Sequence, residues 1–314
     1  MNRAEAKKLL VGPIATVGTP FDKDYEVDYG RMAEMVRWWV ANGLVRGRAV
    51  IKVAAAMGEG PQLSDTEWPL LLRTAVQAAN GKATVYCGIH FKDTVRTIED
   101  CRKALDLGAD GVQINTPFIN DSTQTDILRH YTDVSNAVKI PILVYTVPGY
   151  HNGAIDPDTI RKMTALESVV GIKWTPPKGE EYDQISDVAK SLNIIDNTTQ
   201  PVRAHKLGAR GFINWTCDIY PQFDLKVWDL LEAKNYAEAE AMWEPVYKPL
   251  REQIAKMMKY SGGQARMKKA MMAAMGNPIG SSRAPSAPAT RQELAEVHRL
   301  LAGFGWPVTK AGSW

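Results

Sequence analysis

The chain has 314 residues, of which 45% are hydrophobic and 23% are charged, and this balance is typical of a globular protein. Lys and Arg total 38 against 35 Asp and Glu, and the basic residues are scattered, so composition gives no sign of a nucleic-acid partner. No apolar run reaches the roughly 18 residues of a membrane span, and the first residues lack a signal-peptide core. We therefore expect a cytoplasmic protein without a membrane partner.

Cysteines and histidines are few and widely spaced. Cys87, Cys101 and Cys217 are an odd number at long intervals, which indicates reduced thiols rather than a disulfide framework or a zinc cluster. The five histidines form no HxH or HxxxH pair. We expect no dedicated metal site.

Short β-branched runs alternate with helical patterns along most of the chain. Ser64 with Glu67 forms a capping box, and Asp156 followed by Pro157 places a cap before proline at a first helical position. The expected strands cover residues 13–20, 47–55, 83–90, 111–116, 140–147, 168–174, 192–198 and 211–216.

Eight strand–helix units in about 230 residues predict a (β/α)8 barrel. The alternative is a doubly wound parallel sheet, but no GxGxxG follows the first strand and no GxxxxGK[ST] occurs. From about residue 235 only helical patterns continue, and the last of them begins with a capping box from Thr290 to Glu293. We expect one domain, with a catalytic barrel over residues 1–234 and a helical extension over residues 235–314.

Lys173 is the strongest candidate for a catalytic residue. Catalytic residues of such barrels lie at the C-terminal ends of strands, and Lys173 stands near the end of the apolar run "VVGIKW". A free lysine has a pKa of about 10.4, and burial can lower it by several units. The neutral amine would then attack a carbonyl group and form a Schiff base. The alternative is a structural lysine paired with a carboxylate at the barrel mouth.

Tyr145 stands at the same end of the preceding strand. A phenol beside an amine can relay protons during imine formation and collapse, although an isolated strand tyrosine usually packs. Its place beside Lys173 favours the relay. Lys52, on the second strand, is a rival amine that we interpret as structural or salt-bridged. His90 falls on a loop at the same face and could touch substrate, whereas Glu59 is expected to bond backbone amides of its turn.

Residues that follow the same strand ends are predicted to line a pocket around the lysine and the tyrosine. This set is Ala56, Met57, Gly58, Phe118, Ile119, Tyr150, His151, Trp174, Ile213, Asn214 and Trp215.

Four segments together resemble the N-acetylneuraminate lyase and dihydrodipicolinate synthase family. They are "YTVPG" with Tyr145, "GIKW" with Lys173, the turn "MGEGPQLSDTEW", and "LGARGFINW", and the similarity covers almost the whole chain. The resemblance implies a class I Schiff-base (β/α)8 barrel with a three-helix C-terminal extension. It implies Lys173 as the imine-forming lysine and Tyr145 as its proton relay. It also implies a homo-oligomer, a tetramer or a dimer, with no metal or organic cofactor and a small carbonyl substrate.

The chain departs from the family's pattern around the substrate. The family's turn GTTGE or GSTGE, whose hydroxyls grip the carboxylate of pyruvate, reads "AAMGE" at residues 55–59. Phe118 and Ile119 replace a tyrosine pair, and Tyr150 replaces a common arginine. Losing a hydrogen bond to a charged group costs about 1.5 to 3 kcal/mol. We therefore expect an apolar or aromatic substrate, as in the family's hydratase-aldolases, and we exclude dihydrodipicolinate synthesis.

The main prediction is a Schiff-base lyase, of the aldolase or hydratase-aldolase type, acting on a carbonyl compound or 2-oxo acid. Two alternatives stay open. One is a dehydratase, deaminase or decarboxylase of a small oxo acid that uses the same lysine imine, with Tyr150 and His151 placing the leaving group. The other is a non-catalytic ligand-binding barrel, against which the retention of both Tyr145 and Lys173 argues.

Overall fold

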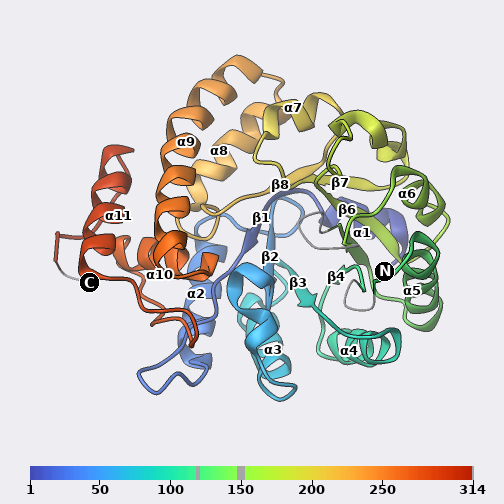
Figure 1. The fold of residues 1–314 in the computed structure, drawn as a ribbon, viewed down its shortest axis with the longest axis horizontal. Coiled ribbons are helices and arrows are strands. Elements are labelled where there is room, and N and C mark those ends of the chain that lie inside the picture. Colours follow the sequence, from blue (N-terminus) through green and yellow to red (C-terminus); the bar gives the residue numbers. More distant parts are fainter. Residues whose placement is uncertain (118–120, 147–152, 313–314) are drawn as a thin grey trace.

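In the computed structural model, which describes residues 1–117, 121–146 and 153–312, eight parallel strands close into a barrel (Figure 1). The strands follow each other around the barrel in chain order, so the predicted (β/α)8 barrel is confirmed. They are β1 (Gly12–Thr16), β2 (Val50–Val53), β3 (Thr84–Ile89), β4 (Gly111–Asn115), β5 (Ile142–Tyr145), β6 (Val169–Trp174), β7 (Asn193–Asp196) and β8 (Gly211–Ile213).

Helices cover the outside of the barrel and begin where the sequence places caps. The Ser64 hydroxyl accepts the Glu67 backbone N–H at 3.2 Å, and the Glu67 carboxylate accepts the Ser64 N–H at 2.8 Å, so this capping box is confirmed. The barrel helices are α1 (Arg3–Leu9), α2 (Tyr29–Ala41), α3 (Glu67–Ala79), α4 (Thr94–Asp106), α5 (Gln124–Ala137), α6 (Pro157–Met163), α7 (Pro201–Lys206) and α8 (Pro221–Glu232). Short 3-10 turns are η1 (Ala56–Gly58), η2 (Gly60–Gln62) and η4 (Tyr182–Lys190).

The interior of the barrel changes character along its axis. A buried apolar layer includes Ile14, Val50 and Leu143, together with Ala6 on α1 and Leu10 directly after that helix. Inward-facing residues alternate along a strand, so the next inward layer toward the C-terminal ends comes two residues later. That layer is polar, and it forms the floor of the site described below.

Three further helices follow α8 and lie outside the barrel, the first of them packed against α8, as Figure 1 shows. They are α9 (Tyr236–Tyr260), α10 (Gln264–Ala274) and α11 (Arg291–Gly303). The predicted capping box of Thr290 and Glu293 is present at the start of α11. The division of the chain at residues 234 and 235 stays a prediction. None of the described helices is long and apolar enough to cross a membrane.

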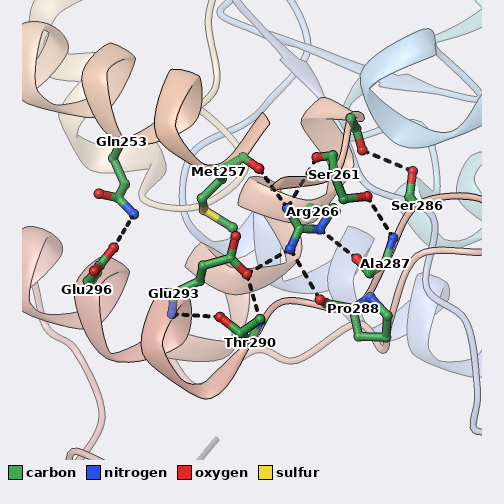
Figure 2. A network of polar contacts seen from close by, with 11 residues as sticks. Gln253, Met257, Ser261, Arg266, Ser286, Ala287, Pro288, Thr290, Glu293 and Glu296 are labelled. Carbon is green, nitrogen blue, oxygen red and sulfur yellow. Dashed lines mark hydrogen bonds and ion pairs between the residues drawn. The ribbon is translucent and has the colours of Figure 1, made fainter. Parts of the chain in front are cut away.

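The buried side chain of Arg266 ties these three helices together (Figure 2). It donates hydrogen bonds to the carbonyls of Met257 and Ser261 at the end of α9 and to those of residues 287 and 288 before α11. It also forms an ion pair of 2.7 Å with Glu293 on α11. The guanidinium thus adds charged donors to carbonyls at the end of α9 and joins that end to the start of α11.

Candidate active site

A cavity of about 510 Å³ opens at the C-terminal end of the barrel. Its floor and sides come from the strands, and its outer wall comes from Met258, Gly263 and Gln264 at the α9–α10 turn. A second hollow of about 570 Å³ lies between α7 and α9, but its walls carry charges of both signs and no residue of a barrel strand. We therefore place the chemistry in the barrel cavity.

Lys173 lies on this cavity near the end of β6 and is 7% exposed. Burial lowers the pKa of its amine to about 7. No ion pair joins Lys173 to a carboxylate within the described residues, so the alternative of a salt-bridged structural lysine has no partner there. A desolvated amine of this kind is partly neutral near pH 7 and can act as a nucleophile.

Tyr145 is the neighbour of Lys173 on the adjoining strand. The two residues are in register between β5 and β6, and the Lys173 Nζ lies 3.6 Å from the centre of the Tyr145 ring. Both side chains line the cavity. The structure thus brings together the two residues that the sequence paired, while their catalytic roles stay a prediction.

Lys52 is a second amine in the same cavity. It is fully buried on β2, and its Nζ donates to the Gln113 Oε1 at 2.5 Å. Burial, and then the charge of Lys173, lower the pKa of Lys52 well below its usual value. The interpretation of Lys52 as salt-bridged is wrong within the described residues, since the partner of its amine is the neutral amide of Gln113. His90 is not among the described lining residues, and burial lowers its pKa to about 3.

The turn after β2 contributes backbone and apolar surface. Ala56 and Met57 line the cavity within η1, and their contact with substrate stays a prediction. Gly58 is buried beneath the turn and is not among the described lining residues, so its predicted contact with substrate has no support. A Cβ on Gly58 would lie 2.0 Å from the Val17 carbonyl oxygen, which explains the glycine.

Glu59 ends this turn with a positive φ of 64° and anchors it to the C-terminal extension. Its carboxylate pairs with the Lys269 Nζ at 2.9 Å, and both side chains are buried. Lys269 also donates to the Ser281 carbonyl at 2.8 Å. The expectation that Glu59 binds backbone amides is therefore wrong, because its carboxylate neutralises a buried ammonium from α10.

Trp174 does not line the cavity, so its predicted place there is wrong. Its side chain is fully buried outside the barrel, and its indole N–H donates to the Tyr182 carbonyl at 3.0 Å. Successive residues of a strand point to opposite faces, so an inward Lys173 sends its neighbour outward. The other predicted pocket residues Phe118, Ile119, Tyr150 and His151 lie outside the described residues.

Three predicted residues at the end of β8 and directly after it do line the cavity, namely Ile213, Asn214 and Trp215. The Asn214 amide is hydrogen-bonded to the buried Asp224, which turns its side chain into the protein. The Trp215 indole N–H donates to the Gln264 Oε1 at 3.2 Å and so connects the barrel to α10. The side chains of Asn214 and Trp215 at this edge of the cavity are therefore held in place by hydrogen bonds to other parts of the protein.

The electrostatics of the cavity are one-sided. Its described lining contains Lys52, Lys173 and Arg251 but no Asp or Glu. Such a cavity attracts an anionic ligand. Thr16, Gln113 and Arg251 also line the cavity, and the sequence did not single them out. Thr16 and Gln113 lie on β1 and β4, two strands that the sequence did predict. No cluster of metal-ligating side chains occurs among the described residues.

A buried, desolvated lysine beside a tyrosine, at the C-terminal mouth of a (β/α)8 barrel, is an arrangement suited to Schiff-base chemistry. The chain belongs to the Dihydrodipicolinate synthetase family, whose model matches residues 9–303. The resemblance found in the sequence is thereby confirmed, and the chain is a class I lyase of that family.

Individual relatives are similar to this chain over nearly its whole length. The 4-hydroxy-tetrahydrodipicolinate synthase of Heliobacterium modesticaldum is 30% identical, over 93% of this chain and 95% of its own. The dihydrodipicolinate synthase structure from Aquifex aeolicus has a TM-score of 0.84 at 23% identity and covers 96% of this chain and 100% of its own. The one from Acinetobacter baumannii, solved with pyruvate, has a TM-score of 0.80 at 25% identity and covers 94% and 99%.

These comparisons contradict the predicted function. The sequence analysis excluded dihydrodipicolinate synthesis and favoured an apolar or aromatic substrate, yet the relative at 30% identity is named for that synthesis. The physical reason lies in the cavity. The prediction counted the hydroxyls missing from the turn but not the basic groups of Lys52 and Arg251, and it placed Trp174 in a pocket that it does not reach.

Proposed function

We propose that this protein joins pyruvate to an amino aldehyde and releases 4-hydroxy-tetrahydrodipicolinate. The observation that carries the proposal is the desolvated amine of Lys173 in a cavity whose described charges are all basic. The name of the relative from Heliobacterium modesticaldum and the pyruvate held by the Acinetobacter baumannii enzyme support the choice of substrates. Two carboxylates on the product suit a cavity lined by three basic side chains.

The product's structure defines the second substrate. Its ring nitrogen lies between two carbons that each carry a carboxylate, and its hydroxyl is on the carbon opposite the nitrogen. Pyruvate supplies one carboxylate, its ketone carbon and its methyl carbon. The remaining carbons are an aldehyde, a methylene, a carbon bearing an amine, and a carboxylate. The second substrate is therefore the aldehyde of a four-carbon amino acid.

Lys173 would carry the reaction through a covalent imine. Its neutral amine attacks the ketone of pyruvate, and water leaves to give a protonated imine. Loss of a proton from the methyl group forms an enamine, whose carbon attacks the aldehyde while the aldehyde oxygen takes up a proton. The substrate's own amine then attacks the imine carbon, closes the ring and frees Lys173. One water is released for each product.

Tyr145 would move the protons. Its ring lies against the Lys173 amine, so its phenol is carried by the strand next to the reacting nitrogen. A group with this placement can take the proton that the amine loses after it adds to the ketone, and can return it to the hydroxyl that leaves as water. The backbone amides of the turn at residues 56–59 offer further donors for a carboxylate.

The test is product analysis with pyruvate labelled with 13C on every carbon. The wild type should convert it, together with the amino aldehyde, into a product that contains three labelled carbons. Lys173→Met, which keeps an apolar chain of similar length without an amine, should make none. A product without the label, or equal turnover by Lys173→Met, would contradict the proposal.

We also propose that the protein is a cytoplasmic homo-oligomer, a dimer or a tetramer. Large apolar side chains are exposed on the neighbouring helices α3 and α4, with Leu70 at 48%, Val95 at 65% and Leu105 at 42%. A second copy would cover such side chains. Light scattering at micromolar concentration should give twice or four times the chain mass, and a stable monomer would contradict this part of the proposal.

A further inference from the structure

Three polar side chains converge on the floor of the cavity from three strands. Thr16 on β1 is in register with Lys52 on β2, and Lys52 is hydrogen-bonded to Gln113 on β4. All three line the cavity, and their exposed fractions are 2%, 0% and 1%. They lie at the depth of the barrel where the inward layer turns from apolar to polar.

These groups lack partners of the kind that burial demands. The Thr16 hydroxyl is buried without a hydrogen-bond partner among the described residues. The Lys52 ammonium has a neutral amide as its partner, and no carboxylate of the described chain pairs with it. Burial without a counter-ion lowers the pKa of the Lys52 amine, and a buried hydroxyl without a hydrogen bond destabilises a fold, so native proteins rarely keep such groups without a reason.

The donors that remain are arranged for an anion. Gln113 accepts the Lys52 bond with its oxygen, which leaves its amide N–H groups free to donate. Lys52 uses one of three N–H donors in that bond, and the Thr16 hydroxyl can donate as well. A carboxylate between the two amines would also offset the burial and the Lys173 charge that lower the pKa of Lys52.

We propose that Thr16, Lys52 and Gln113 form a carboxylate-binding subsite that holds the carboxylate of the 2-oxo acid joined to Lys173. The inference rests on the proposed function and deepens it. The turn at residues 55–59 carries no hydroxyl, and this subsite supplies charged and neutral donors from the barrel floor instead. The specificity for a 2-oxo acid over a plain ketone or an ester thus resides in β1, β2 and β4.

The experiment compares pyruvate with methyl pyruvate, which has the same ketone but no carboxylate charge. Each is incubated with the full-length protein, reduced with borohydride, and the adduct is quantified by intact mass. Lys52→Met should raise the half-saturating concentration of pyruvate by about 10- to 100-fold, the range for a lost bond to a charged group. The value for methyl pyruvate should change less than about threefold, because an ester offers no charge to Lys52.

Thr16→Val is the variant that separates binding from folding. It removes a hydroxyl without a partner in the described protein, so it should keep or raise the melting temperature while it raises the half-saturating concentration of pyruvate about threefold or more. Thr84→Val is the matched control. Thr84 is also buried with an unpartnered hydroxyl, but it is not among the residues that line the cavity. Its variant should bind pyruvate like the wild type.

Two results would overturn the subsite. One is a Lys52→Met variant whose half-saturating concentration of pyruvate equals that of the wild type. The other is an equal loss of affinity for pyruvate and methyl pyruvate in that variant, which indicates a general disturbance of the cavity. A wild-type protein that forms an adduct with methyl pyruvate but none with pyruvate would overturn the proposed function as well. The failure of the subsite alone leaves the wild-type pyruvate adduct intact.

Discussion

The rate at which Lys173 forms an imine should follow a titration near neutral pH. Burial lowers the pKa of this amine to about 7 from a usual value of 10.5. At pH 7 about half of the molecules then hold a neutral amine, against roughly 3 in 10,000 for an unperturbed lysine. The fold therefore raises the concentration of the nucleophile by a factor on the order of 1,000.

The sign of the effect is fixed by the direction of the pKa. The neutral form is the nucleophile, so the initial rate should rise about tenfold for each pH unit below 7 and level off above about pH 8. The assay mixes protein with excess pyruvate for a short, fixed time at each pH, stops the reaction with borohydride and measures the adduct by mass. A rate that keeps rising to pH 10, as for an exposed lysine, would contradict a pKa of about 7 for the Lys173 amine.

Three further predictions follow from single contacts. Lys173→Met should raise the free energy of unfolding at pH 7 by up to about 4 kcal/mol, because burial of the wild-type lysine disfavours its protonated form. This gain should shrink as the pH rises toward 10, where the unfolded lysine also loses its proton, and urea unfolding at both pH values measures the gain and its decrease. Arg251→Ala should raise the half-saturating concentration of the amino aldehyde severalfold and leave the pyruvate adduct unchanged, whereas a weakened pyruvate adduct would place Arg251 elsewhere. Lys269→Met should cost about 3 to 5 kcal/mol because it leaves the Glu59 carboxylate buried and unpaired, and adding Glu59→Gln should recover part of the loss; no recovery would contradict the pairing.

The barrel and its central pair were predictable because both depend on local patterns. Each strand is a short β-branched run between helix caps, and eight such units leave few alternatives to a closed barrel. Tyr145 and Lys173 end neighbouring parallel strands, whose C-terminal ends meet at one rim, so their proximity followed from spacing alone. The strands are mostly shorter than expected, because the apolar runs continue beyond the last ladder bond into buried loops.

The orientation of Lys52 could not be predicted in the same way. In a barrel both faces of a strand are buried, so β2 carries no alternation of polar and apolar residues from which to infer direction. The orientation of Trp174 could have been predicted, because successive side chains of a strand point to opposite faces and Lys173 points inward. Arg251 comes from α9, far along the chain, and only the packing of the extension brings it to the cavity.

Peptide mapping of the borohydride-reduced pyruvate adduct tests directly whether Lys173 is the amine that forms the imine, since Lys52 lines the same cavity. We expect a single modified peptide that contains Lys173, with Lys52 unmodified, and no adduct in Lys173→Met. Modification of Lys52, or a Lys173→Met variant that still traps pyruvate, would contradict it.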